Sequence, residues 1–286
     1  MKRFLLFVNA QKERAPETAG FVKSYLLSRG AEKAEITESL AGLAPGDRAE
    51  QAALLKEYDC VITFGGDGTI IRAARCTAGS SIPIAGINLG HLGYLTLVSD
   101  QSQIHVLLDA LLQDRCSTEK RMMLEGSVYT SGDALVSESQ LSLNEIVISR
   151  KSTAGAVDFC VMVNGAFLNE YKADGIIIST PTGSTAYNLS AGGPIVDPTA
   201  RMTILTPICP HALNRSSIVL KAEDMIDLLI PETASDSVSL SFDGAVQRDI
   251  HPGSRIHIGE SELYTSLICL KGGSFLSRIR SKLTAL

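Results

Sequence analysis

The sequence predicts an α/β plus β protein, in which an N-terminal three-layer α/β domain with a parallel sheet precedes a mostly antiparallel β C-terminal domain. Strand-like and helix-like segments alternate up to about residue 120, as in repeated β-then-α units. From Met122 to Ile258, short β-branched runs separated by Gly, Asn, Asp, Ser and Pro replace helical periodicity. We therefore expect one domain over 1–120, a β-rich domain over 121–260, and a segment over 261–286 that returns to the first domain.

The N-terminal region opens with a nearly continuous apolar run at Arg3–Asn9, the pattern of a strand buried on both faces. Pro16–Arg29 has helical composition, with Pro16 near a plausible first turn. A second buried strand, Cys60–Phe64, ends at a glycine-rich turn, and Thr69–Cys76 follows as a helix with Thr69 as a candidate cap. Three more elements are expected: a helix at Ala49–Glu57, a strand at Ile82–Ile87 and an amphipathic helix at Gln103–Gln113.

The β-rich region contains several apolar, β-branched runs that are typical of strands. Examples are Leu143–Ser149, Val157–Val163, Gly175–Ser179, Ser217–Leu220, Ile226–Ile230 and Val238–Phe242. The last part of the chain returns to a strand-then-helix pattern, with a strand at Leu263–Leu270 and a basic helix at Ser274–Leu286.

Composition excludes several classes of protein. A 45% hydrophobic and 20% charged chain of 286 residues can bury a sizeable core, which excludes disorder. The net charge of −5 and pI of about 5.6 argue against a nucleic-acid partner. No apolar run approaches the roughly 20 residues that a bilayer core demands, and the run Phe4–Val8 is shorter than the roughly 7–15 residues of a signal peptide. We expect no membrane partner.

The six cysteines are scattered without a CxxC pair, so we expect reduced, mostly buried thiols and a cytoplasmic location. The five histidines show no metal spacing, and we assign no metal ligand. The sequence also lacks GxxxxGK[ST], HExxH and GxSxG, and has no GxGxxG between a strand and a helix. P-loop, zinc-protease, elbow-type hydrolase and Rossmann sites are therefore not supported.

The first candidate site is Gly65-Gly66-Asp67-Gly68-Thr69, between a buried strand and a helix. Its glycines let a ligand approach main-chain N–H groups, and the helix start suits phosphate. Asp67 would repel phosphate unless a metal ion bridges them or the carboxylate handles a proton. A plain turn with Asp67 capping the helix fits the residues equally well.

Three further clusters carry polar groups at strand ends. A dense array of hydroxyls, Thr180–Tyr187, follows Asp174 and the buried strand Gly175–Ser179, which fits a phosphate or sugar-hydroxyl site as well as a plain connector. Gly90-His91-Leu92-Gly93-Tyr94-Leu95 is either a hinge or a turn with an aromatic ring that can stack. Asn144 and Glu145 open a strand, where an amide and a carboxylate can hydrogen-bond a base edge and ribose hydroxyls; an exposed strand end is the simpler interpretation.

The order of these clusters along the chain resembles the NAD kinase family. The residues that carry the resemblance are Gly65–Thr69, Leu89–Leu95, Asn144-Glu145, Asp174-Gly175 with Thr180–Tyr187, Gly192-Gly193-Pro194, and Phe242-Asp243-Gly244. Thr180–Tyr187 is the most specific of them. The sequence departs from the family pattern at Tyr94, where Phe is usual, and at Ala245, where Gln commonly follows Asp-Gly, which leaves the role of Asp243 open.

The resemblance implies transfer of the γ-phosphoryl group of ATP, or of polyphosphate, to the adenosine ribose 2′-hydroxyl of NAD. It assigns Asp67 as the catalytic base, with Gly66 and Gly68 admitting substrate, and Mg²⁺ or another divalent metal as cofactor. It further implies a homodimer or homotetramer. The residues assigned to substrate binding are Gly66, Gly68, Thr69, Tyr94, Asn144, Glu145, Lys172, Asp174, Ser184, Thr185, Ala186, Tyr187 and Ser190.

Two other functions share parts of this pattern. Lipid or sphingoid kinases have the same Gly-Gly-Asp-Gly-Thr turn, but the acidic chain shows no amphipathic membrane helix. A non-catalytic NAD(H) sensor would use the same grooves, yet a pure binder gains nothing from a carboxylate that faces phosphate.

Overall fold

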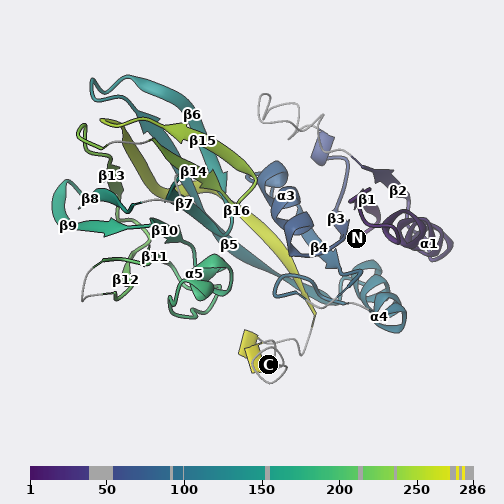
Figure 1. Cartoon of the computed structure of the whole chain (residues 1–286). Coiled ribbons are helices and arrows are strands. Elements are labelled where there is room, and N and C mark those ends of the chain that lie inside the picture. The colour runs from purple at the N-terminus through teal and green to yellow at the C-terminus, as the bar shows by residue number, and fades with distance from the viewer. Residues whose placement is uncertain are drawn as a thin grey trace. The chain divides into compact units, whose positions relative to one another are not determined.

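The structure is a computed structural model. It describes residues 1–38, 54–90, 93–98, 100–151, 155–211, 215–234, 237–270, 275–276 and 279–280. The chain divides into two compact units (Figure 1): unit 1 comprises Met1–Arg121 and Tyr264–Leu286, and unit 2 comprises Met122–Leu263. Two long strands, β5 (Cys116–Tyr129) and β16 (Arg255–Leu270), contribute residues to both units. The chain thus passes from one unit to the other within strands.

Unit 1 contains a parallel sheet. Its strands are β1 (Arg3–Val8), β2 (Lys33–Thr37), β3 (Cys60–Phe64), β4 (Pro83–Ile87) and the C-terminal end of β16, in the order β2-β1-β3-β4-β16. Every neighbouring pair in this order is parallel. Because β3 is buried along its whole length, its apolar run is continuous rather than alternating, as expected for a sheet covered on both faces.

Helices cover both faces of that sheet. Buried residues of α1 (Ala15–Ser28) and α4 (Gln101–Leu112) share one core with Ala85 and Ile87 of β4. Successive residues of a strand face opposite sides of the sheet, so the intervening Gly86 faces the other side. There the side chain of Ile70, in α3 (Asp67–Thr77), packs against the Cα of Gly86. The helices therefore form two outer layers around the sheet, which confirms the predicted three-layer α/β arrangement.

Unit 2 is built from antiparallel pairs of strands in two sheets. One sheet has the order β12-β11-β10-β7-β14-β15, and the other places β16, β13, β8 and β9 side by side, with β5 paired to β16 and β6. The strand bounds are β6 Leu135–Ser142, β7 Glu145–Arg150, β8 Val157–Val163, β9 Ala166–Ala173, β10 Gly175–Ser179, β11 Met202–Ile208, β12 Ile218–Lys221, β13 Ile226–Leu229, β14 Val238–Phe242 and β15 Val246–Ile250.

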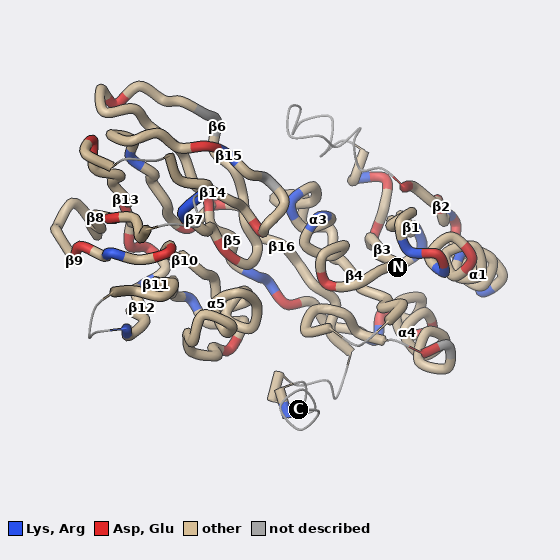
Figure 2. The backbone as a smooth tube through the Cα atoms, viewed as in Figure 1, with Lys and Arg blue, Asp and Glu red and all other residues tan. Residues whose placement is uncertain are grey.

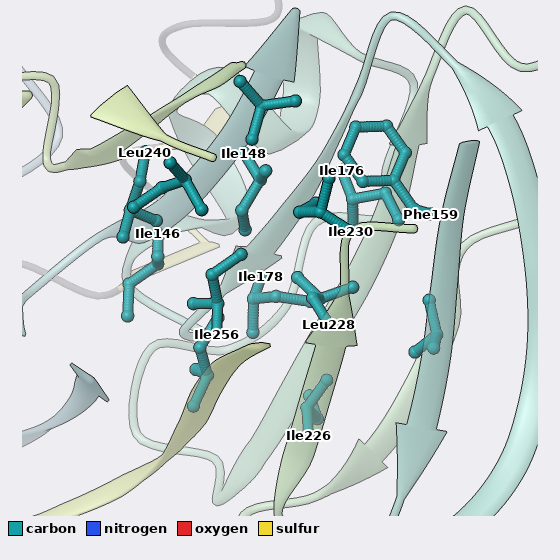
Figure 3. Close-up of a cluster of buried hydrophobic side chains, with 14 of the residues drawn as sticks. Ile146, Ile148, Phe159, Ile176, Ile178, Ile226, Leu228, Ile230, Leu240 and Ile256 are labelled. Carbon is teal, nitrogen blue, oxygen red and sulfur yellow. The ribbon is translucent and has the colours of Figure 1, made fainter. Parts of the chain in front are cut away.

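Alternate residues of the two sheets form one apolar core (Figure 3). Ile146 and Ile148 of β7 and Ile178 of β10 belong to the same cluster as Ile226 and Leu228 of β13. At the end of β10 the chain forms a 3₁₀ turn, η2 (Gly183–Thr185), and the short helix α5 (Tyr187–Ser190). Lys and Arg lie interspersed with Asp and Glu along both units (Figure 2).

The predicted fold class is confirmed, but several elements differ from expectation. No individual strand was singled out at β2, β5, β6, β9, β11 or β15, and β16 is much longer than the predicted strand Leu263–Leu270. In β2, Lys33, Glu35 and Thr37 interrupt the apolar pattern because the strand forms an edge of the sheet. Residues 49–53, most of Ser274–Leu286, and His91 and Leu92 lie outside the described residues; residues 54–55 are helical.

All six cysteines are free thiols. The expectation that they are mostly buried is wrong: only Cys60 and Cys269 are buried, and Cys209 is exposed at the turn that follows β11. No helix within the described residues is long and apolar enough to cross a bilayer.

Candidate functional site

The glycine-rich turn joins β3 to α3. The helix begins at Asp67, two residues earlier than predicted, and its N-cap residue is Gly66, which forms no side-chain cap. Thr69 is therefore not the cap; it is buried in the first turn, where its N–H donates to the carbonyl of Gly66 at 2.9 Å. A helix that starts inside the glycine run exposes its first main-chain N–H groups at the turn itself.

The carboxylate of Asp67 is held by a second loop rather than by its own helix. The N–H of Tyr94 donates to Oδ2 at 2.8 Å, and the N–H of Leu95 donates to Oδ1 at 3.1 Å. This approach requires glycine at position 93, since a Cβ there would lie 2.0 Å from Asp67 Oδ1. The helix-capping interpretation of Asp67 is thus wrong, because the loop amides bind its side chain.

Gly66 and Gly68 show the opposite environment. A Cβ added at either position would meet no described atom within 4 Å, and Gly66 has a φ of −88°, which any residue adopts. Neither packing nor the φ angle therefore explains why residue 66 is a glycine rather than a larger residue. Space next to the free N–H groups of a helix start suits a phosphate group.

Unit 2 brings two of the predicted clusters together. Antiparallel pairing of β7 with β10 sets Ser179 opposite Glu145, so the hydroxyl-rich segment leaves β10 where β7 begins. The N–H of Thr180 donates to the carbonyl of Asn144 at 2.8 Å, and its hydroxyl donates to the carbonyl of Leu143 at 2.6 Å. Gly183 passes so close that a Cβ would lie 2.1 Å from the carbonyl oxygen of Asn144.

Glu145 is buried at this junction. Its side chain accepts a hydrogen bond from the N–H of Tyr187, while no described donor reaches its buried Oε2 atom. Burial, together with the negative charge of Asp243, raises the pKa of Glu145 to about 8. A buried carboxyl oxygen without a partner costs free energy, so a ligand that supplies that partner is stabilised here.

Asp243 binds the main chain on the other side of this segment. Its Oδ2 accepts from the N–H of Leu143 at 3.0 Å, and its Oδ1 accepts from the N–H groups of Asn144 at 2.8 Å and Glu145 at 3.2 Å. The segment 143–145 is therefore fixed through its N–H groups by Asp243, and through the carbonyls of Leu143 and Asn144 by Thr180.

Asp174 and Lys172 lie at the other end of the same strand pair. Gly175 pairs with Ser149, whereas Ser179 pairs with Glu145, so the length of β10 separates Asp174 from the junction. The carboxylate of Asp174 binds Arg150 through two contacts, at 2.8 Å and 3.1 Å. Lys172 is exposed on β9.

The remaining predicted residues lie in the segment after β10. Tyr187 and Ser190 are exposed, and Thr185 and Ala186 are half-buried. Ser184 is fully buried, and its hydroxyl exchanges hydrogen bonds with the backbone of Val196 at 3.3 Å and 3.1 Å. Its hydroxyl therefore shapes the loop from within.

Comparisons with known proteins decide the family. Residues 4–116 match the family model "ATP-NAD kinase N-terminal domain", and residues 143–270 match "ATP-NAD kinase C-terminal domain". The NAD kinase of Lachnospira eligens is 38% identical over 99% of this chain and 100% of its own length. That of Caldanaerobacter subterraneus is 39% identical over 99% of both chains. The chain belongs to the NAD kinase family.

Solved structures show the same fold. Yeast NADH kinase complexed with NADH has a TM-score of 0.82 at 24% identity, over 98% of this chain and 86% of that chain. An NAD kinase from Archaeoglobus fulgidus in complex with ATP has a TM-score of 0.74 at 24% identity, over 99% of both chains. The chain thus shares its fold with these two solved kinases.

Three residues of this NAD kinase family member had no role assigned from sequence. Arg150 holds Asp174, and Asp243 holds segment 143–145. Buried Asn188 donates from its Nδ2 to the carbonyls of Ser184 and Pro194 at 3.1 Å and 3.0 Å. Only Asp243 had a sequence signal: the triplet Phe242-Asp243-Gly244 is one of those that carry the family resemblance, and Asp-Gly is a common turn pair.

Proposed function

We propose that the protein is an NAD kinase that transfers the γ-phosphoryl group of ATP to the 2′-hydroxyl of the adenosine ribose of NAD. The observation that carries the proposal is the match of both family domains, in order, together with relatives that align over 99% of the chain. The open turn at Gly66–Gly68 and the unpartnered carboxyl oxygen of Glu145 support it, because one suits phosphate and the other a polar nucleoside group.

In this proposal Asp67 takes the proton of the ribose 2′-hydroxyl as its oxygen bonds to the γ-phosphorus of ATP, while the bond from that phosphorus to the β,γ-bridging oxygen breaks and ADP leaves. Two main-chain donors fix its carboxylate, and each oxygen keeps a lone pair for a further donor such as a hydroxyl. The ATP phosphates lie against the N–H groups at the start of α3, in the space left by Gly66 and Gly68. Phosphoryl transfer depends mainly on such positioning and on charge stabilisation.

The residues of the turn fit a divalent cation that arrives with ATP. The described residues contain no group of three or more His, Cys, Asp and Glu side chains able to hold a metal ion. Mg²⁺ commonly binds substrate phosphates, water and one or two carboxylates, and Asp67 offers a carboxylate at this turn. When bound, Mg²⁺ would offset the negative charge of the phosphates beside Asp67.

The NAD site in this proposal is the junction of β7 with the segment after β10. In this proposal Asn144 and Glu145 bind the adenosine, and Thr185, Ala186, Tyr187 and Ser190 contact the dinucleotide. Tyr94, in unit 1, is proposed separately as a residue whose ring can stack. Asp174 and Lys172 contribute from the other end of β10, and buried Ser184 contributes by holding the loop that carries Thr185–Ser190. The six free thiols support a reducing, cytoplasmic compartment, and we further infer a homodimer or homotetramer.

The test is incubation of the purified protein with ATP, Mg²⁺ and NAD, with NADP read by a dehydrogenase that accepts only NADP. We expect NADP to form in proportion to protein. Tight NAD binding without NADP would contradict the proposal and indicate a nucleotide sensor. A parallel assay with diacylglycerol should give no product, and phosphorylation of that lipid alone would indicate a lipid kinase.

A further inference from the structure

We infer that Asp243 is a positioning residue of the nucleotide site: its carboxylate gathers the main-chain N–H groups of Leu143, Asn144 and Glu145 and so fixes the side chains of Asn144 and Glu145 toward the ligand. This inference rests on the proposed function, and it assigns a role to a residue that the sequence leaves open. Three features of the hairpin and its neighbours carry it.

The first feature is the turn itself. Asp243 and Gly244 have φ values of 51° and 68°, and the N–H of Ala245 donates to the carbonyl of Phe242 at 3.0 Å. These are the marks of a type I′ β-turn over residues 242–245, within the three-residue connection that joins Phe242 of β14 to its partner Val246 of β15. Such a turn accepts Asn-Gly as well as Asp-Gly. The turn therefore explains a residue that tolerates positive φ, but it does not explain a carboxylate.

The second feature is what the carboxylate binds. The β7–β14 ladder pairs Ile146 with Phe242, and the N–H of Asp243 extends the ladder by donating to the carbonyl of Glu145 at 3.0 Å. The N–H groups of residues 143–145 instead donate to the side-chain carboxylate of Asp243, at 2.8–3.2 Å. Hydrogen bonds to an ionised acceptor are stronger than neutral ones, so this contact holds the segment firmly.

The third feature is the electrostatic effect on Glu145. Among the described groups that act on Glu145, Asp243 is the charged side chain, and the N–H of Tyr187 is the main-chain donor. The charge of Asp243 acts with burial to favour the protonated form of Glu145. The same carboxylate thus sets both the position of Glu145 and the pH at which it ionises.

The variant Asp243→Asn tests the carboxylate of Asp243 while leaving the turn intact. Asn-Gly keeps the type I′ turn, but the side chain loses its charge, and its NH₂ group cannot accept from an N–H. We expect the KM for NAD to rise about 10- to 100-fold, while kcat and the KM for ATP change less than about twofold. We also expect the pH midpoint of NAD binding to move to lower pH, which a merely structural change would not cause.

Asp133→Asn is the matched control. Asp133 also has a positive φ of 56° in a hairpin turn of unit 2, but its exposed carboxylate pairs with Arg255 at 2.7 Å. This variant should retain the wild-type KM for NAD and the wild-type pH midpoint. If Asp243→Asn does not fold, Asp243→Gly, which also allows the turn, replaces it.

The outcomes separate this inference from the proposed function. Absence of NADP from the wild-type protein would refute the proposed function. An active wild type with an Asp243→Asn variant of unchanged KM for NAD and unchanged pH midpoint would refute the role of Asp243 alone. Failure of both Asp243 variants to fold would show that Asp243 serves folding rather than ligand positioning, and would also overturn the inference.

Discussion

Two acidic side chains, Asp67 at the start of α3 in unit 1 and Glu145 at the start of β7 in unit 2, are surrounded very differently. Both oxygens of Asp67 accept main-chain N–H groups, and the residue is half-buried. Glu145 is buried, faces the negative charge of Asp243 and keeps one oxygen without a described partner. The first carboxylate is fixed before any ligand arrives, whereas the second can gain a partner from one. This difference suits a base in the first case and a binding group in the second.

The largest effect should come from Asp67→Asn. The amide cannot take a proton, so kcat should fall about 10²- to 10⁴-fold, the usual contribution of a general base. NAD affinity should change less than kcat, because Asn144 and Glu145 are the residues assigned to hold the adenosine. Rates would be measured by NADP formation, and circular dichroism would verify folding. Asp114→Asn, at an exposed carboxylate of unit 1, should keep wild-type kcat. Near-full turnover by Asp67→Asn would show that Asp67 is not the catalytic base.

The next effect should come from Gly93→Ala, which tests whether the position of Asp67 matters. The new Cβ would lie 2.0 Å from Asp67 Oδ1 and must displace the carboxylate. A displacement of about 1 Å can reduce the rate about 10²-fold, and we expect a loss of that order in kcat. Gly20→Ala, in α1, meets no described atom within 4 Å and should leave kcat unchanged. Equal kcat for both variants would show that the fixed position of the Asp67 carboxylate is not needed for catalysis.

A smaller effect is expected for the pH dependence of NAD binding. Ribose hydroxyls donate more strongly to an ionised carboxylate, so NAD should bind Glu145 more tightly once it loses its proton. The Kd for NAD should therefore decrease by up to about tenfold per pH unit as pH rises toward 8, and level off above it. Calorimetric titration of the wild type against Glu145→Gln would measure this. A Kd as pH-dependent in Glu145→Gln as in wild type would exclude Glu145 as the titrating group.

The last expected effect is on stability, and its maximum slope per pH unit matches that of NAD binding. The pKa of Glu145 is raised from 4.5 in the unfolded chain to about 8 in the fold, so the folded protein binds more protons between these values. The free energy of unfolding should therefore fall as pH rises through that window, by at most about 1.4 kcal/mol per pH unit. Urea denaturation of wild type and Glu145→Gln should show this slope only in the wild type. Parallel stability curves would mean that Glu145 ionises normally in the fold.

Sequence patterns predicted the elements with strong local signals. The wholly apolar strand Cys60–Phe64 and the runs Val157–Val163, Gly175–Ser179 and Val238–Phe242 match the observed strands residue for residue. Strands with polar positions, such as β2 and β9, carry no such signal because one face or edge meets water. The start of α3 was misplaced because glycine and aspartate look like a turn, while a tertiary contact with residues 94–95 holds Asp67 in helix.

The glycine-rich turn, the hydroxyl-rich segment and the pair Asn144-Glu145 could be recognised from sequence because each is a short motif beside an apolar run. Their surroundings could not. The contacts of Asp67 with residue 94, of Asp243 with residues 143–145, and of Thr180 with Asn144 join residues far apart in the chain. Which donors reach a carboxylate, and whether it is buried, depends on register and packing between strands. The sequence alone therefore determined the fold class and the chemical groups present, and tertiary packing decided their charge, orientation and free hydrogen-bonding atoms.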